Sequence, residues 1–317
     1  MADPARAGPG RACPVDYRYG ERALAGPATL CADTLWIAGG LYGNPFALSS
    51  LEALCAEERG ESALLFNGDF HWFDIDAAMF SAIDRGVAVH AATRGNVETE
   101  LAQPQAGAGC GCGYPDWVGD EDVERSNRIM ERLKETAGRV PGTAERLVAL
   151  PMYRIAEAGG VRIAIVHGDA DSLAGWKFSQ EHLATPQGRD DARRALLAAN
   201  VSVFASSHTC LPVLQAIGEA GLIVNNGSAG MPNFAGTSYG LATRIALTPH
   251  PKALYRARSG PLHVEAIPIE FDAPAWRAAF LAQWPHGSDA HASYFERIAK
   301  GPRYDVNDAV RDTATRR

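Results

Sequence analysis

The chain has 317 residues, which is enough for one large domain or two small ones. Hydrophobic residues make up 46% of it, a share typical of soluble globular proteins. The formal net charge of -7 gives no long-range attraction for nucleic acid or an anionic membrane, so we expect neither as a partner. No apolar stretch approaches the roughly 20 residues needed to cross a bilayer, and the first residues lack the apolar core of a signal peptide. We therefore expect a cytoplasmic protein.

The first part of the chain alternates strands and helices. After a flexible lead-in over residues 1–28, Thr34–Ala38 has the pattern of a strand, and Asn44 followed by Pro45 predicts the cap and first turn of a helix. The next expected elements are a strand, a helix with its cap at Asp74, and a second strand, over residues 63–66, 74–86 and 87–92. This order is typical of βαβ units and indicates an α/β fold.

The pattern then changes up to about residue 150. A segment rich in glycine and cysteine over 107–115 precedes a charged helix over Asp120–Ala137, which Gly138 ends. We interpret residues 99–146 as an insertion that lies over one end of the core.

Further strands and helices complete the chain. Tyr153–Ala158 and Val161–Val166 flank Gly159-Gly160, which suits a two-residue hairpin turn. The other elements expected before the tail are a helix over 190–199 and strands over 201–205, 212–217, 222–225, 239–247 and 263–271. An amphipathic helix opens a helical tail over 273–317.

Four polar side chains directly follow four of the apolar, strand-like runs. They are one carboxylate, one amide and two imidazoles, from Asp69, Asn96, His167 and His208. Because loops at strand ends of one α/β core can meet at a common site, we expect the four to converge. Such a donor set suits a borderline divalent ion such as Mn, Fe or Zn.

Each of the four residues also has a simpler interpretation. Asp69 could cap a turn, and Asn96 after a glycine could be a turn residue. His167 and His208 could each be a core histidine whose hydrogen bonds are satisfied. Only the joint order of the four residues favours the metal site.

The order and content of these loops resemble the calcineurin-like metallophosphoesterase family. The family motifs Gly-Asp, Gly-Asn-His-(Asp/Glu), His-Gly and Gly-His-Thr-His have counterparts in Gly68-Asp69, Gly95-Asn96-Val97-Glu98, His167-Gly168 and Ser207-His208-Thr209-Cys210. The first family motif, Asp-x-His-Gly-Asn, is altered here to Gly40-Leu41-Tyr42-Gly43-Asn44. The resemblance implies a four-layer αββα sandwich of two mixed β-sheets flanked by helices, in a domain over residues 29–272.

The resemblance also assigns the ligands to two metal ions. The positions that bind the second ion in the family are intact, as Asp69, Asn96, His167 and His208. The positions that complete the first site are replaced, by Gly40, Tyr42 and Cys210. The family's histidine that assists the leaving group is replaced by Val97. The resemblance thus implies one divalent ion and leaves a second one open.

Cysteines offer another way to complete the site. Cys110, Cys112 and Cys210 could build a substitute first site together with Tyr42, because thiolates bind soft metals well. The alternative is a flexible loop with two incidental thiols at positions 110 and 112, since Cys-x-Cys alone is not specific. The six cysteines of so long a chain do not indicate a disulfide framework.

Three more side chains are candidates for a catalytic role. His71 could reach the site as an acid or a ligand, or it could pack beside Trp72. Arg94 could bind a phosphate through two nitrogens, or it could be a solvated surface residue. Glu98 fits the acidic option of the family's third motif, which orients neighbouring groups.

Three functions agree with these patterns. The first is a metal-dependent phosphoesterase that hydrolyses a phosphate ester or anhydride of a small phosphorylated substrate with a metal-activated water. The second is a catalytically impaired metallophosphoesterase-like protein with a binding or regulatory role. The third is a thiol-bearing metal site with different chemistry.

Overall fold

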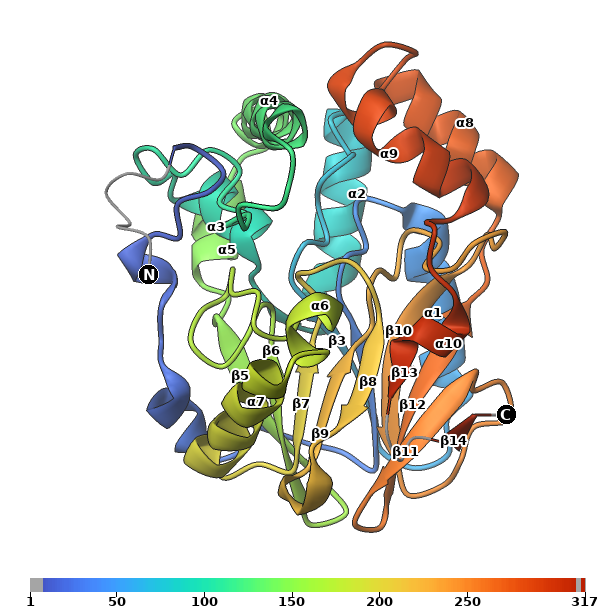
Figure 1. Cartoon of the computed structure of the whole chain (residues 1–317). Helices are drawn as coiled ribbons and strands as arrows, with labels where there is room; N and C mark the ends of the chain where they lie inside the picture. Colours follow the sequence, from blue (N-terminus) through green and yellow to red (C-terminus); the bar gives the residue numbers. More distant parts are fainter. Residues whose placement is uncertain (1–7, 312–314, 317) are drawn as a thin grey trace.

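Two β-sheets packed face to face form the centre of the molecule. The computed structural model describes residues 8–311 and 315–316. Helices cover the outer face of each sheet, so that four layers follow one another as helix, sheet, sheet and helix (Figure 1). This architecture confirms the predicted αββα sandwich of two mixed sheets.

The first sheet combines parallel and antiparallel neighbours. In order across the sheet, its strands are Leu30–Cys31 (β1), Tyr153–Ala158 (β5), Val161–Val166 (β6), Val203–Ser206 (β7), Leu222–Asn225 (β9), Val213–Ala216 (β8) and Val310–Arg311 (β13). Strands β6, β7 and β9 are mutually parallel, whereas the hairpin β5–β6 and the pair β8–β9 are antiparallel.

The second sheet is also mixed. In order across the sheet, its strands are Thr315–Arg316 (β14), Tyr255–Ser259 (β11), Leu262–Ile269 (β12), Gly240–Ala246 (β10), Thr34–Ala38 (β2), Ser62–Asn67 (β3) and Ala91–Thr93 (β4). Strands β2, β3 and β4 are parallel, and the remaining pairs are antiparallel.

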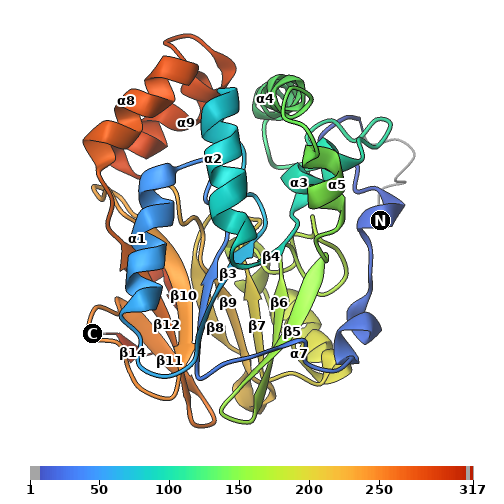
Figure 2. The same cartoon turned by 180° about the vertical axis from the view of Figure 1, so that it is seen from behind.

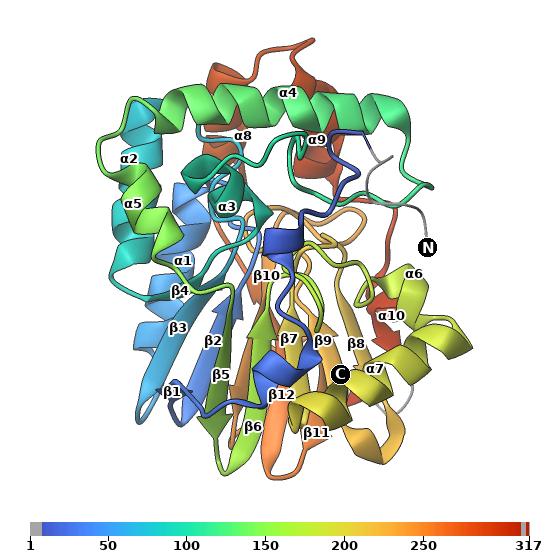
Figure 3. The ribbon, with the colours of Figure 1, turned by 90° about the vertical axis from the view of Figure 1, so that its left-hand side faces the viewer.

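Helices pack on both outer faces and across one end of the sheets. They are Pro45–Ala56 (α1), Ala77–Ala88 (α2), Asn96–Ala102 (α3), Asp120–Ala137 (α4), Thr143–Val148 (α5), Gln180–Leu183 (α6), Pro186–Ala199 (α7), Ala273–Gln283 (α8), Asp289–Lys300 (α9) and Val306–Ala309 (α10). Helices α1 and α2 lie on the second sheet (Figure 2), and α4 runs across one end of the molecule (Figure 3). Within residues 8–311, no helix is long and apolar enough to cross a membrane.

The side chains of β2 show how the layers are held together. Leu35 and Ile37 are buried in the apolar layer between the sheets, where they join residues of the first sheet such as Ile165. Trp36 and Ala38 belong to the other face of the strand, under the helices. Because successive side chains of a strand point to opposite faces, a strand covered on both sides is apolar at every position.

Helix α2 begins and ends later than predicted. Asp76 caps it by accepting hydrogen bonds from the backbone N–H groups of residues 78 and 79, so Asp74 is not the cap. Phe80, Ile83 and Val87 form one continuous buried face of the helix. The predicted strand over 87–92 is therefore wrong at its start, and β4 is shorter than expected.

Both ends of the described chain pack against the core. Tyr17 and Leu24 are fully buried, which corrects the expected flexible lead-in for residues 8–28, while residues 1–7 lie outside the described residues. In the tail, Trp276, Phe280 and Trp284 are buried in the core under the helices. The tail contains helices α8, α9 and α10, and it also adds β13 and β14 to the two sheets, which the sequence pattern did not predict.

Asn44 fixes the start of α1 close to the ends of β2 and β3. Its Oδ1 accepts hydrogen bonds from the N–H groups of Phe46 (3.0 Å) and Ala47 (3.1 Å), and its Nδ2 donates to the carbonyl of Gly230 (3.0 Å).

Asn44→Ala removes three hydrogen bonds at a buried position, so we expect the free energy of unfolding to fall by about 1–3 kcal/mol in urea titrations. Ser49→Ala in the same helix is the control, with an expected change of less than about 0.5 kcal/mol.

Candidate metal centre

The four predicted ligands come from the carboxyl ends of strands in both sheets. Asp69 follows β3, and Asn96 follows β4 as the first residue of α3. His167 follows β6 and His208 follows β7. The site therefore lies where the ends of the two packed sheets meet.

The potential ligand atoms of these residues converge. One atom each of Asp69, His167 and His208 lies within 4.8 Å of the others. Nε2 of His167 is central, at 3.3 Å from Oδ2 of Asp69 and 3.2 Å from Nδ1 of His208. Oδ1 of Asn96 also lies 3.3 Å from this nitrogen. All four side chains are buried.

Backbone carbonyls set which nitrogen of each imidazole carries the proton. Nδ1 of His167 lies 2.8 Å from the carbonyl oxygen of Asn67, and Nε2 of His208 lies 2.9 Å from that of Cys112. A carbonyl oxygen only accepts hydrogen bonds, so each of these nitrogens donates. The lone pairs of the other two nitrogens, Nε2 of His167 and Nδ1 of His208, are thereby directed at each other.

The amide of Asn96 is oriented in the same way. Its Nδ2 donates to the carbonyl of Cys110 (3.0 Å), so its Oδ1 faces the imidazole of His167. An amide oxygen, a carboxylate oxygen and two imidazole lone pairs thus share one small space. These groups repel one another unless a proton or a cation lies between them. The donor set fits a divalent metal ion, which Asp69, Asn96, His167 and His208 would hold.

The titration of the metal-free site is consistent with a place for one positive charge. Burial and the neighbouring His167 lower the pKa of His208 to about 4, so this imidazole is neutral near pH 7. Burial disfavours the charged form of His167, but the carboxylate of Asp69 outweighs it and raises the pKa of His167. Although burial opposes it, the same pairing holds the pKa of Asp69 below its ordinary value. A proton on Nε2 of His167 and a cation bound by the four residues would therefore take the same position.

Glu98 organises the two loops that carry Asp69 and Asn96. Its buried carboxylate accepts hydrogen bonds from the backbone N–H groups of Asp69 (2.8 Å), Phe70 (3.0 Å), His71 (3.3 Å) and Gly95 (2.9 Å). This agrees with the expected orienting role and not with that of a catalytic acid. Glu98 therefore fixes the backbone of the loop that carries Asp69 and the backbone directly before Asn96.

The glycines before Asp69 and Asn96 are required by close packing. Gly68 has a φ of 73°, and a Cβ added to it would lie 2.5 Å from Nδ1 of His167. A Cβ on Gly95 would lie 2.4 Å from Oδ1 of Asp69. The Gly-Asp and Gly-Asn pairs thus allow the loops to approach each other closely enough for their ligands to meet.

Tyr42 and Cys210 lie beside this site and are paired with each other. The Tyr42 hydroxyl is 2.9 Å from Sγ of Cys210. A Cβ added to Gly40 would lie 2.9 Å from the Tyr42 ring. The Tyr42 ring therefore occupies the space that a larger side chain at position 40 would need. Two of the residues that replace first-site ligands in the resemblance are therefore paired with each other.

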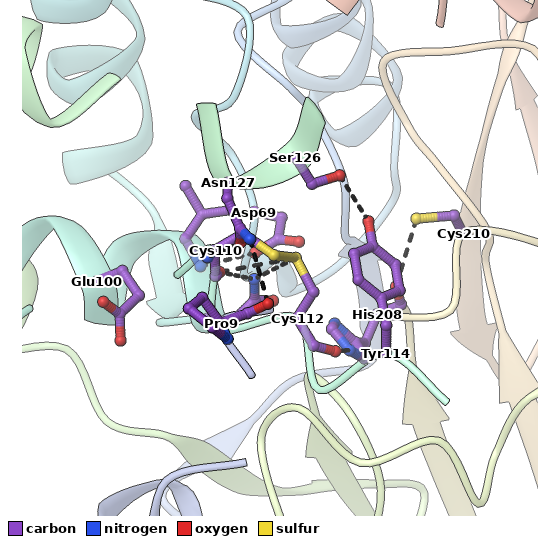
Figure 4. Close-up of a disulfide and its surroundings, with 12 residues drawn as sticks. Pro9, Asp69, Glu100, Cys110, Cys112, Tyr114, Ser126, Asn127, His208 and Cys210 are labelled. Carbon is purple, nitrogen blue, oxygen red and sulfur yellow. Dashed lines mark hydrogen bonds between the residues drawn. A yellow bond between two sulfur atoms is a disulfide. The ribbon is translucent and has the colours of Figure 1, made fainter. Parts of the chain in front are cut away.

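Cys110 and Cys112 form a disulfide in the structure, against the expectation of free thiols (Figure 4). Their sulfurs are bonded to each other and are not thiolate ligands in this state. The substitute metal site, which was one of two alternatives for these cysteines, would require the disulfide to be reduced. Cys13, Cys31, Cys55 and Cys210 are free.

His71 and Arg94 are not among the residues that line the pocket at the metal centre. His71 stacks on Phe80 with ring centroids 3.8 Å apart, and its Nδ1 is 2.6 Å from Oδ2 of Asp74. Arg94 donates from its guanidinium to the carbonyl of Val148 (2.8 Å). His71 is thus held by ring stacking and by Asp74, and Arg94 is held by a backbone carbonyl.

A narrow pocket with aromatic walls opens beside the ligands. Centres of water-sized molecules fit within only about 40 Å³ of it. It is lined by Tyr42, Asp69, Trp72, Asn96, Val97, Cys112, Tyr114, Trp176, His208, Cys210 and Tyr294. This set contains no lysine or arginine. Cys112 and Tyr114 belong to residues 99–146, the segment that the sequence analysis interprets as an insertion.

The sequence patterns did not identify Tyr114, Trp176 and Tyr294 as site residues. They come from the insertion, from the loop after β6 and from α9 of the tail. No sequence motif contains all three residues. The glycine-rich sequence around Tyr114 was the one feature that could have marked it as a site residue.

The comparisons with known proteins concern the fold. No family model matches the sequence, and no curated protein is found to match it. A metallophosphoesterase from Sphaerobacter thermophilus is similar in structure, with 14% identity, a TM-score of 0.53, and coverage of 85% of this chain and 100% of its own. The hypothetical protein PH1004 from Pyrococcus horikoshii OT3 has 16% identity and a TM-score of 0.58, with coverage of 87% and 100%. The chain is therefore a divergent protein with the metallophosphoesterase fold.

Proposed function

We propose that the protein is a metal-dependent phosphoesterase with a single divalent ion. The observation that supports this best is the convergence of three acceptor atoms, from Asp69, Asn96 and His208, on Nε2 of His167. The N–H groups of Asn96, His167 and His208 are all turned away, onto backbone carbonyls. This arrangement prepares the site for a cation and not for a proton network.

The chain's own residues hold and orient the reactants. Asp69, Asn96, His167 and His208 would bind the ion, which when present polarises a phosphoryl oxygen and lowers the pKa of a bound water. Glu98 keeps the ligand loops in place, and the aromatic walls limit the number of water molecules that reach the pocket. The reaction then depends on positioning and charge stabilisation, as phosphoryl transfer generally does.

The pocket offers hydroxyl donors but no strong acid. Val97 lies at the position of the family's histidine and is apolar. Burial, together with Cys210, raises the pKa of Tyr294 to about 12, so its hydroxyl stays protonated and can donate a hydrogen bond. Loss of a general acid typically costs about 10²–10⁴-fold in rate, so we expect slow turnover and a requirement for a good leaving group.

The charge of the pocket favours a substrate with one negative charge. Asp69 is buried there, and the described residues that line the walls include no lysine or arginine. A phosphate diester carries one negative charge near pH 7, whereas a monoester carries up to two. We therefore propose a diester, or an ester of similar charge, as the preferred substrate.

Hydrolysis of chromogenic esters tests this proposal. With added Mn²⁺, Zn²⁺ or Fe²⁺, we expect the purified protein to hydrolyse bis(p-nitrophenyl) phosphate faster than p-nitrophenyl phosphate. Asp69→Asn should lower the rate at least ~10²-fold, because it removes the charge of the ion's carboxylate ligand. Asp171→Asn, at an exposed ion pair with Lys177, is the matched control and should leave the rate unchanged. If Asp69→Asn hydrolysed the ester as fast as the natural chain, the proposal would be wrong.

A second candidate function is ligand binding without turnover. The hydrogen bond between Tyr42 and Cys210, the apolar Val97 and the small pocket volume favour it. In that case the protein would bind the metal and an uncleaved phosphate ester, and no metal would support hydrolysis. Equilibrium binding of diphenyl phosphate, a diester, to the metal-loaded protein, measured by calorimetry beside the rate assay, separates the two functions.

A further inference from the structure

The disulfide Cys110–Cys112 joins two buried residues of a glycine-rich loop. Four glycines in this loop have positive φ values: 77° at Gly107, 62° at Gly109, 66° at Gly111 and 58° at Gly113. Residues 103–119 contain no helix or strand. Because a glycine backbone has many alternative conformations, the covalent link across Gly111 restricts how Cys110 and Cys112 lie relative to each other.

The carbonyl groups of the two linked cysteines contact two of the metal ligands. The carbonyl of Cys110 accepts from Nδ2 of Asn96 (3.0 Å), and the carbonyl of Cys112 accepts from Nε2 of His208 (2.9 Å). The Cys112 carbonyl also accepts from Nε1 of Trp176 (3.0 Å). Figure 4 shows the disulfide lying among Asp69, His208 and the residues of the loop.

These two carbonyls decide the orientation of the ligands. If the carbonyl of Cys110 moves, the amide of Asn96 can rotate and present its Nδ2 to the site in place of Oδ1. If the carbonyl of Cys112 moves, the proton of His208 can shift to Nδ1, and the ligand lone pair is lost. Both ligands thus depend on one short segment of backbone.

We propose that Cys110 and Cys112 are positioning residues of the metal centre, whose disulfide holds the carbonyls that orient Asn96 and His208. Metal affinity then depends on the redox state of this pair. The inference rests on the metal site of the proposed function, but it does not require hydrolysis. It assigns to the Cys-x-Cys sequence a role other than that of thiolate ligands.

Reduction of the disulfide Cys110–Cys112 takes up two electrons and two protons. Added dithiothreitol breaks the S–S bond; each cysteine sulfur gains one electron and one proton, and the reagent is oxidised to its cyclic disulfide. The loop then keeps its other anchors. The N–H of Cys110 still donates to Oδ1 of Asn127 (2.9 Å), and Trp176 still donates to the carbonyl of Cys112. The N–H of Gly10 also donates to the carbonyl of Ala108 (2.8 Å), and the N–H of Tyr114 donates to the carbonyl of Gly10 (2.9 Å). We therefore expect weaker metal binding and not its complete loss.

Titration with Mn²⁺ tests the inference, with free Mn²⁺ measured by its electron paramagnetic resonance signal. Mn²⁺ is the suitable probe because it prefers oxygen and nitrogen ligands, so newly formed thiols do not compensate. The oxidised full-length protein is compared with the same protein reduced, freed of dithiothreitol without oxygen, and checked by thiol counting. We expect the dissociation constant to rise about tenfold on reduction, as is typical when groups that orient metal ligands are lost.

A double variant and a control complete the experiment. Cys110→Ser/Cys112→Ser should show the same rise without any reductant, and should no longer respond to dithiothreitol. Cys31→Ser changes an exposed free cysteine of β1 and should bind Mn²⁺ like the unchanged protein. Circular dichroism checks that each form is folded, and the reduced natural chain provides the result if the double variant is not.

The possible outcomes separate this inference from the proposed function. Equal Mn²⁺ affinity in oxidised and reduced protein would overturn the positioning role and leave the metal site intact. Tighter Mn²⁺ binding after reduction would also overturn it, in favour of the thiols as ligands. If the oxidised protein bound no Mn²⁺, Zn²⁺ or Fe²⁺, both the metal site and this inference would be wrong.

Discussion

His167→Ala is expected to remove bound metal from the protein, with the largest effect of any single substitution in the site. Nε2 of His167 is the atom around which the other three ligand atoms are grouped, at 3.2 to 3.3 Å. Its loss leaves Asp69, Asn96 and His208 without the central ligand and with a cavity between them. Elemental analysis after equilibration with Mn²⁺ or Zn²⁺ and removal of free metal should give a content at the level of buffer alone.

A second histidine provides the matched control. His182 lies in α6, paired with Asp191 at 2.9 Å, and it is not among the clustered ligands. His182→Ala should retain the metal content of the natural chain. Full metal content in His167→Ala, with a normal circular dichroism spectrum, would show that the ion binds elsewhere and would contradict the site.

Glu98→Gln is expected to destabilise the protein strongly although it preserves the shape of the side chain. The carboxylate accepts four backbone N–H groups and is fully buried. An amide in its place turns one acceptor oxygen into a donor that faces other donors. We expect the free energy of unfolding to fall by about 3–5 kcal/mol, the usual cost of breaking a buried charged interaction by changing one partner.

Urea unfolding followed by circular dichroism measures this change. Glu135→Gln on the exposed side of α4 is the control and should alter the free energy of unfolding by less than about 0.5 kcal/mol. A Glu98→Gln protein as stable as the natural chain would mean that the loops of Asp69 and Asn96 are held by other contacts.

Local sequence patterns predicted those elements in which the pattern and the packing agree. The hairpin β5–β6 and helix α4 have the predicted bounds, because alternation around Gly159-Gly160 and the charged helical face are local features. Helix α2 was predicted less well, since its buried face continues through Val87 into residues that also suit a strand. The tail strands β13 and β14 are two residues long and exist through pairing with distant strands.

The pocket walls could not be predicted because their contacts join distant parts of the chain. Tyr294 reaches the site from α9, and Trp176 from the loop after β6. A tyrosine on an amphipathic helix has the same local pattern whether it faces a core or a pocket. Only the packing of α9 against α4 decides between the two.

By itself, the sequence determined which four candidate ligands lie together, because each follows an apolar strand and the carboxyl ends of such strands meet at one edge of the core. The tertiary structure alone decided how those ligands are oriented and what surrounds them. His208 and the carbonyl of Cys112 are 96 positions apart, yet this one contact sets the proton position of the imidazole. The free energy of such a contact depends on distance and direction in space, and these are properties of the packed loops and not of the local sequence.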